Sequence, residues 1–202
     1  ASKLWHTSNL YRIPEQETVA EKLVANSCAE RVFFCNSGAE ATEGAVKVAR
    51  RFAWANGEKD RTEIICATGA FHGRTLAMLA ANDRPLFREG FGPSAQGFTH
   101  VEWGDIENLK KHIGEHVAAI LVEPVQGEGG ARKAPAGYLK SLQKIAKKNG
   151  VKTIALTSED SPLARLSDVV LHIHTHLENN LHIPMTSRLA HLAIIDILSG
   201  IL

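Results

Sequence analysis

The residues with the clearest capacity for chemistry are the four at 36–39 (NSGA), which form a small polar turn after the apolar run 32–35 (VFFC). An apolar run of about four residues is typical of a short buried strand. Ser37 and Glu40 have the spacing of a capping box, which predicts that a helix begins at Ser37. The first amide groups of a helix lack partners within it and lie at the positive end of its dipole. This turn therefore suits a phosphate group, and the alternative is an ordinary strand–turn–helix junction that binds nothing.

A second candidate anion site lies in the last quarter of the chain, where Thr157, Ser158 and Ser161 precede Pro162. Hydroxyl groups just ahead of a helix start can bind an anion through the helix N-terminus. The same residues also form ordinary ST-turns and helix caps, because their side chains bond to nearby backbone groups. We favour the structural interpretation for this segment.

Three alternating histidines, His172, His174 and His176, are the only group with the pattern of metal ligands. A strand over these residues places all three on one face, where imidazoles can bind zinc, nickel or copper. No thiolate accompanies them, so we expect an edge strand with solvated histidines and predict no metal site.

Alternating helices and strands must position these residues. Periodic apolar residues and caps predict helices over 14–27, 38–55, 106–113, 138–148 and 186–198. Apolar runs predict strands over 32–35, 64–67, 98–102, 117–122, 151–156 and 169–173. The first helix should pack on the strand at 32–35. This order predicts an α/β fold, a three-layer sandwich with a mostly parallel sheet of about six strands.

Composition narrows the function classes. The chain has 202 residues, of which 44% are hydrophobic, enough for one core with a small appendage. Its 23 Lys and Arg nearly balance 22 Asp and Glu, so neither nucleic acid nor a membrane is an expected partner. No secretory signal or apolar run of about 18 residues is evident, and we expect a cytoplasmic protein whose oligomeric state stays open. Because the first residue is not Met, we expect a preceding N-terminal segment.

Four ordered sequence motifs carry a family resemblance: LWHTSNLYRIPEQE at 4–17, FFCNSGAEA at 33–41, GAFHGRT at 69–75 and ILVEPVQGEGG at 120–130. With these motifs, residues 1–150 resemble the class III (fold type I) pyridoxal-phosphate aminotransferases, and most of all the acetylornithine aminotransferase group. Residues 151–202 instead resemble the C-terminal part of a SIS (sugar isomerase) domain. We therefore expect an aminotransferase large-domain fragment over 1–150 and a SIS-like part over 151–202 that completes the same sheet.

The aminotransferase resemblance implies a site for pyridoxal phosphate. It implies that Gly38 and Ala39 present backbone N–H groups to the cofactor phosphate, with Ser37 beside them, and that Phe71 stacks on the pyridine ring. It also implies that Arg74 contacts the substrate carboxylate. Glu128 matches a glutamate that pairs with an arginine farther along the family sequence. Without the resemblance, Phe71 is most simply a core aromatic residue, and Arg74 and Glu128 are solvated charges.

Two groups that the resemblance requires are not evident after Gly150. Pyridoxal catalysis needs a lysine that forms a Schiff base and an acid that pairs with the ring nitrogen. Glu159 and Asp160 match no aminotransferase motif, and no segment resembles the lysine loop. The sequence alone therefore favours a hybrid domain, engineered or recombined, without transaminase activity and with at most weak binding of a phosphate ligand at 37–39. Pyridoxal phosphate is a possible cofactor, held non-covalently if it binds. The alternatives are an acetylornithine-type aminotransferase that transfers an amino group to 2-oxoglutarate, and a sugar-phosphate-binding SIS module.

Overall fold

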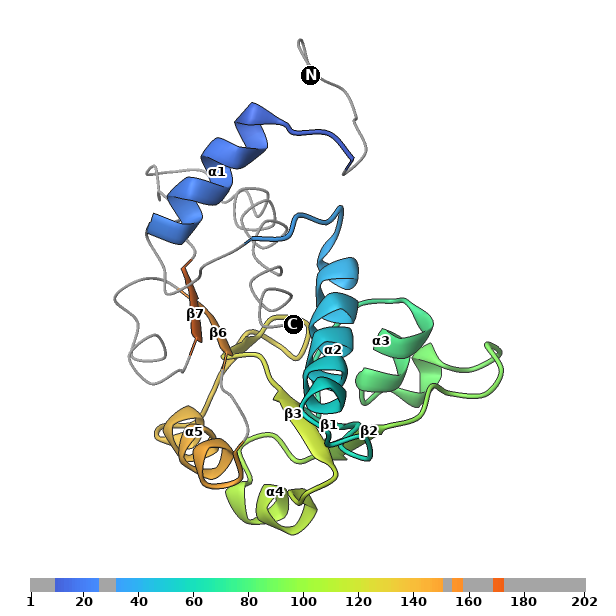
Figure 1. Cartoon of the computed structure of the whole chain (residues 1–202). Coiled ribbons are helices and arrows are strands. Elements are labelled where there is room, and N and C mark those ends of the chain that lie inside the picture. Colours follow the sequence, from blue (N-terminus) through green and yellow to red (C-terminus); the bar gives the residue numbers. More distant parts are fainter. Residues whose placement is uncertain (1–9, 26–31, 151–153, 158–168, 173–202) are drawn as a thin grey trace.

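The computed structural model describes residues 10–25, 32–150, 154–157 and 169–172 (Figure 1). Its helices are α1 Pro14–Ala25, α2 Gly38–Ala55, α3 Leu76–Ala81, α4 Ile106–His112, α5 Tyr138–Lys148 and the 3-10 turn η1 Pro85–Phe87. Its strands are β1 Glu63–Ala67, β2 Phe98–Val101, β3 Val117–Leu121, β4 Val125–Gln126, β5 Arg132–Lys133, β6 Ile154–Thr157 and β7 Val169–His172.

A parallel sheet with the strand order β2-β1-β3 forms the centre of the described fold. Strands β6 and β7 form a separate parallel pair, and β4 and β5 form a short antiparallel hairpin. The predicted α/β class with a parallel sheet is confirmed. Within the described residues the main sheet joins three strands, so the predicted number of about six is not reached there.

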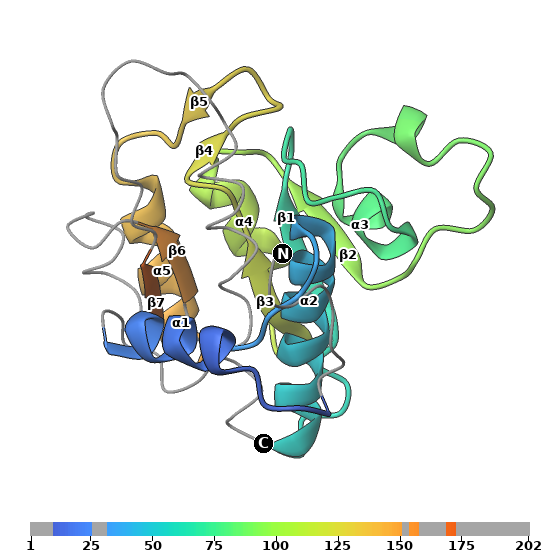
Figure 2. The same ribbon diagram turned by 90° about the horizontal axis from the view of Figure 1, so that it is seen from above.

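Helices cover both faces of this sheet, as Figure 2 shows. Ile64 and Cys66 of β1 pack with residues of α2 and α3, whereas Ile65 packs with residues of α4 and α5. Successive side chains of a strand point to opposite faces, so β1 contributes to two cores. A parallel strand covered on both faces is apolar over its buried length, which explains the four apolar residues that follow Glu63 in β1.

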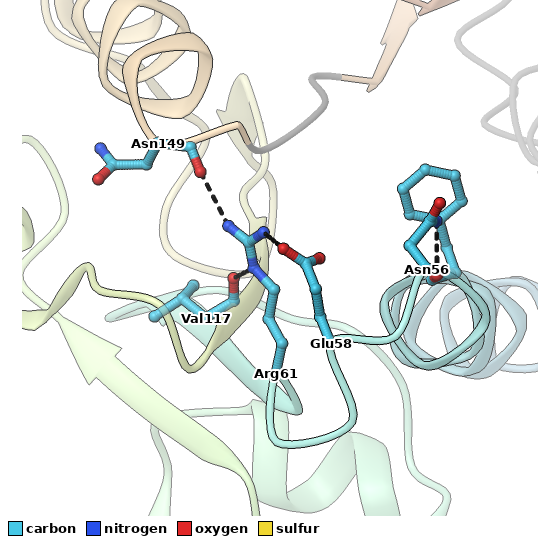
Figure 3. Close-up of polar contacts among 6 residues, drawn as sticks. Asn56, Glu58, Arg61, Val117 and Asn149 are labelled. Carbon is cyan, nitrogen blue, oxygen red and sulfur yellow. Dashed lines mark hydrogen bonds and ion pairs between the residues drawn. The ribbon is translucent and has the colours of Figure 1, made fainter.

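The Arg61 side chain contacts three separate parts of the fold (Figure 3). Its guanidinium donates to the backbone carbonyl of Val117 at 2.7 Å and to that of Asn149 at 2.8 Å. It also pairs with the Glu58 carboxylate at 2.9 Å. Because Asn149 caps the end of α5, this one side chain joins the turn after α2 to the start of β3 and the end of α5.

The predicted strand at 32–35 is wrong. Residues 32–35 have no strand partner in the described part of the chain, and the Phe33 side chain is 42% exposed. The apolar run is of strand length, but a strand also needs a neighbour that pairs with it. The expected packing of the first helix on this segment is wrong as well, because α1 forms but buries none of its residues.

Two small elements differ from expectation. Helix α3 begins at the N-cap Thr75, whose hydroxyl accepts from the Met78 amide, although no helix was predicted there. The segment after Pro124 contains the short strands β4 and β5, which pair with each other, although the sequence predicts no strand there. Both elements are short, and such elements carry little periodic signal. The candidate residues Ser158, Ser161, His174 and His176 and the helix at 186–198 lie outside the described residues.

In the described part of the chain, no helix is long and apolar enough to cross a membrane.

Candidate functional site

The N-terminus of α2 leaves several backbone amides without acceptors. The Ser37 hydroxyl accepts from the Glu40 amide at 3.2 Å, and the Glu40 carboxylate accepts from the Asn36 amide at 2.5 Å. The amides of Ser37, Gly38 and Ala39 donate to no residue of the described structure. A Cβ atom added at Gly38 would meet nothing within 4 Å, so the space beside Gly38 is open.

The loop 69–75 lies directly against this helix start. A Cβ atom added at Gly73 would lie 2.9 Å from the Ala39 Cβ, so only glycine allows this close approach. The Thr42 hydroxyl donates to the backbone carbonyl of His72 at 2.5 Å. These contacts hold residues 72 and 73, which directly follow Phe71, against the first turns of α2.

Thr75 makes a second connection between α2 and the same loop. Its hydroxyl donates to the Glu43 carboxylate at 2.5 Å and accepts from the Met78 amide at 3.4 Å. The side chains of consecutive α2 residues, Thr42 and Glu43, therefore hold the two ends of the segment 72–75.

Phe71 lies next to a carboxyl group at the end of β3. Its side chain is half-buried, and its amide donates to the Glu123 carboxylate at 3.1 Å. Burial raises the pKa of the Glu123 carboxyl, the Phe71 hydrogen bond opposes this shift, and the charge of Glu128 adds to it. Sequence reasoning missed Glu123, although a carboxylate directly after a buried strand is a usable signal.

Arg74 stacks between two aromatic rings. Its guanidinium carbon lies 5.5 Å from the Phe71 ring centroid and 4.0 Å from that of Phe87. Arg84 also lies over Phe87, at 5.3 Å, and donates to the backbone carbonyl of Glu128 at 3.0 Å. The structure thus joins Arg74 to the Glu128 segment through Phe87 and Arg84, neither of which sequence reasoning identified.

Buried Gln126 holds the loop 127–130 on the turn after β1. Its amide donates to the Thr68 carbonyl at 2.8 Å, and its side-chain oxygen accepts from Arg132 at 2.7 Å. A Cβ atom added at Gly129 would lie 2.9 Å from that oxygen, so the glycine permits this packing. The position of Glu128 is therefore set from both sides, by Arg84 and by Gln126.

A family model described as aminotransferase class-III matches residues 1–155. The chain belongs to this family. A second model, described as the SIS domain, matches residues 136–199. Both recognitions made from the sequence are confirmed.

Relatives of this class III chain carry a more specific name. It is 52% identical over 150 residues to the acetylornithine aminotransferase of Rhodobacter capsulatus, covering 74% of this chain and 38% of the relative. It is 46% identical over 175 residues to acetylornithine aminotransferase 1 of Bradyrhizobium diazoefficiens, covering 87% of this chain and 43% of the relative. The chain therefore spans about two fifths of the length of these relatives.

Solved transaminases share the fold. The ornithine aminotransferase of Toxoplasma gondii superposes with a TM-score of 0.69 at 29% identity, over 79% of this chain and 39% of that chain. An (S)-enantioselective omega-transaminase of Thermomicrobium roseum gives 0.68 at 29% identity, over 76% of this chain and 39% of that chain.

These findings overturn the prediction of a hybrid without transaminase activity. Relatives about half identical over 150 residues are named acetylornithine aminotransferases, and the structural neighbours are transaminases. The prediction gave decisive weight to the residues after Gly150, most of which lie outside the described structure. The aminotransferase alternative is the better supported of the two.

His72 is a buried residue of this class III chain, and its backbone is hydrogen-bonded to Asn82. Its side chain is 5% exposed, and its amide donates to the Asn82 side chain at 2.7 Å. The Asn82 amide group in turn donates to the Gly73 carbonyl at 2.8 Å. Burial, with a smaller effect of His100, lowers the pKa of His72 from 6.5 to about 4, so its imidazole is neutral at neutral pH.

Metal binding has no candidate in the described residues, because they contain no group of three His, Cys, Asp or Glu side chains that could hold an ion. His174 and His176 lie outside that part of the chain, so their assignment stays a prediction.

Proposed function

We propose that the chain acts in a pyridoxal-phosphate-dependent aminotransferase of the acetylornithine type, in which an amino group passes to 2-oxoglutarate. The observation that carries this proposal is the set of open amides at 37–39 beside the Phe71 loop. Family membership supports the reaction class, and the names of the relatives support the substrate.

The α2 N-terminus fits the phosphate of the cofactor. Ser37, Gly38 and Ala39 offer amide donors at a helix start where the space beside Gly38 is open. Helix α2 has 18 residues, so its dipole strengthens the attraction of these amides for an anion. A phosphate-bearing molecule is thus the ligand that these backbone groups suit best.

Phe71 and Arg74 suit the rest of the ligand. Phe71 is half-buried and directly precedes the segment 72–73 that contacts α2. Its ring can stack on a flat heterocycle. When bound, pyridoxal phosphate supplies an electron-withdrawing ring that stabilises negative charge on the amino-acid carbon. The exposed Arg74 guanidinium presents a planar set of donors that matches a carboxylate.

The proposed role of Glu128 is to form an ion pair with an arginine. Its side chain is exposed, and its backbone is fixed by Arg84 while the neighbouring Gln126 is fully buried. A carboxylate on a firmly held segment can pair with an incoming guanidinium and release it again.

The test is an amino-transfer assay on the full chain with N-acetylornithine, 2-oxoglutarate and pyridoxal phosphate. We expect glutamate formation above the rate with free cofactor, and a loss of at least tenfold in Phe71→Ala. Leu86→Ala is the matched control, because Leu86 is 76% exposed and no contact with the site involves it. Borohydride reduction with peptide mapping would identify any lysine that bonds to the cofactor. Turnover no faster than that of free cofactor would refute the proposal.

A further inference from the structure

Arg132 of β5 lies where the segments that follow the three strands of the main sheet meet. Its guanidinium donates to the side-chain oxygen of Gln126, after β3, at 2.7 Å. Its guanidinium carbon lies 5.5 Å from the ring centroid of Trp103, after β2. A Cβ atom added at Gly69, after β1, would lie 2.6 Å from Arg132 Nη2, so the guanidinium fills the space beside that glycine. One side chain therefore contacts all three segments at one edge of the sheet.

Gln126 connects Arg132 to the backbone of the turn after β1. The Gln126 side chain is fully buried, and its amide group donates to the Thr68 carbonyl at 2.8 Å. A guanidinium only donates and a backbone carbonyl only accepts, so a single orientation of the Gln126 amide satisfies both partners. The bond from the charged guanidinium is also the stronger of the two. Arg132 therefore fixes the orientation of a buried amide that holds the backbone at 68–69.

We propose that Arg132 is a positioning residue that holds the loop 69–75, and with it Phe71, in place at the proposed cofactor site. Phe71 lies two residues after Gly69, whose backbone packs on the Arg132 guanidinium. The inference rests on the proposed function for the ligand that Phe71 contacts. Arg132 itself touches no ligand in this proposal and lies outside the four sequence motifs.

Arg132 supplies one of three attachments of this loop. The Phe71 amide donates to the Glu123 carboxylate at 3.1 Å, and the His72 carbonyl accepts from the Thr42 hydroxyl. Those two bonds hold the middle of the loop. The Arg132 contacts hold its beginning, where the chain leaves β1, so their loss frees one end of the segment that carries the Phe71 ring.

Arg50 makes a parallel set of contacts at the opposite edge of the sheet. It donates to the Thr62 carbonyl, before β1, at 2.8 Å and to the Gly97 carbonyl, before β2, at 3.0 Å. A Cβ atom added at Gly97 would lie 2.5 Å from Arg50 Nη2, and the guanidinium carbon lies 5.1 Å from the Phe98 ring centroid. Arg50 thus combines the same kinds of contact at the strand ends away from the loop 69–75. Arg50→Met is therefore a matched control.

The experiment is amide hydrogen exchange of the full chain without ligand, measured by mass spectrometry. We expect Arg132→Met to speed exchange in the loop 69–75 by about fivefold or more and to leave exchange in the middle of α2 unchanged. Arg50→Met should leave exchange in that loop unchanged, even if it lowers the melting temperature as much. Arg132→Lys should keep part of the protection, because it keeps the charged donor but loses the planar fork.

Two ligands separate positioning from a general loss of structure. In absorbance titrations, Arg132→Met should bind pyridoxal phosphate about tenfold more weakly, because the Phe71 ring is no longer held for stacking. Its affinity for inorganic phosphate, measured by calorimetry, should be unchanged, because phosphate needs only the amides at 37–39. A general loss of structure would weaken both ligands equally.

Loop exchange that is the same in Arg132→Met and wild type, or that rises equally in Arg50→Met, overturns the proposal. Equal weakening of both ligands in Arg132→Met overturns it as well. The exchange measurement needs neither ligand nor turnover, so it is independent of the proposed function. A wild-type chain without turnover, in which Arg132→Met still frees the loop selectively, would refute the proposed function and leave the positioning role of Arg132 standing.

Discussion

The hydroxyl of Thr42 donates a hydrogen bond to the backbone carbonyl of His72 across 30 residues of sequence, at 2.5 Å. This contact fastens the first turns of α2 to the loop that carries Phe71. The proposed phosphate-binding amides and the proposed ring-stacking residue therefore keep one fixed relation. Because they come from separate segments, any loosening of this bond should affect ligand affinity as well as stability.

Thr42→Val tests that relation. The change keeps the shape of the side chain but removes the hydroxyl, so the His72 carbonyl loses its described partner. We expect unfolding free energy to fall by about 1 kcal/mol in urea titrations, with a several-fold loss of affinity for pyridoxal phosphate. Thr18→Val is the control, because the Thr18 hydroxyl bonds only within exposed α1, to the Pro14 carbonyl. Equal effects of the two changes would remove any special role of Thr42.

Gly73→Ala should separate the loop from α2. The new Cβ would lie 2.9 Å from the Ala39 Cβ, and Gly73 also has a φ of 129° that side chains disfavour. We expect a loss of about 2–3 kcal/mol of stability and weaker cofactor binding. Gly90→Ala carries a similar backbone cost at a φ of 82° but meets open space. If the clash with Ala39 causes the loss of stability, Gly73→Ala will lower the melting temperature clearly more than Gly90→Ala does. Equal melting temperatures would show that the clash contributes little.

Arg61→Ala should destabilise the region where the turn after α2 meets the start of β3 and the end of α5. The side chain of Arg61 is 13% exposed, and its loss leaves the Val117 and Asn149 carbonyls without their described donor. We expect a cost of about 2–3 kcal/mol in urea denaturation. Glu58→Gln removes only the half-exposed ion pair and should cost less than about 1 kcal/mol. If the two variants cost the same, the carbonyl contacts contribute little.

His72 predicts a specific pH dependence of stability. Its folded pKa is about 4 against 6.5 for the unfolded group, so the unfolded chain takes up a proton first as the pH falls. Stability is therefore lost between about pH 6.5 and pH 4, by about 2–3 kcal/mol from this group. His72→Leu keeps the backbone bonds to Asn82 and Thr42 and should flatten that part of the profile. Denaturant titrations at pH 7.5 and 4.5 measure it, and parallel profiles for both proteins would contradict the assignment.

The local features of the fold could be predicted from sequence because they depend on neighbouring residues. The cap at Ser37 and Glu40 predicted the start of α2, and the apolar run in EIICA predicted β1. These signals are short-range, since a cap needs only residues three positions apart.

Other features depend on residues distant in the chain. The segment 32–35 has strand composition, but no described strand pairs with it. Helix α1 has an amphipathic pattern but buries none of its residues in the described structure. The contacts of Thr42 with His72 and of Arg74 with Phe87 likewise join segments whose meeting no local pattern encodes. The function was misjudged for a related reason, because absent motifs in the last 50 residues outweighed a match across the first 150.

The most direct test of the account is the binding of pyridoxal phosphate to the α2 N-terminus. Gly38→Pro removes one amide donor from the turn at 37–39. The cost to the fold should be small, because Gly38 is the first helical residue and Ser37 has φ −155° and ψ 159°, an extended conformation that suits a following proline. Gly38→Ala keeps the amide and adds a methyl group in open space.

An absorbance titration of the full chain with pyridoxal phosphate compares wild type, Gly38→Ala and Gly38→Pro, with inorganic phosphate as a competitor. We predict that wild type and Gly38→Ala bind with similar affinity, that phosphate competes, and that Gly38→Pro binds at least tenfold more weakly with an unchanged melting temperature. Equal affinity in Gly38→Pro and Gly38→Ala, or no binding by the wild-type chain, would contradict the account.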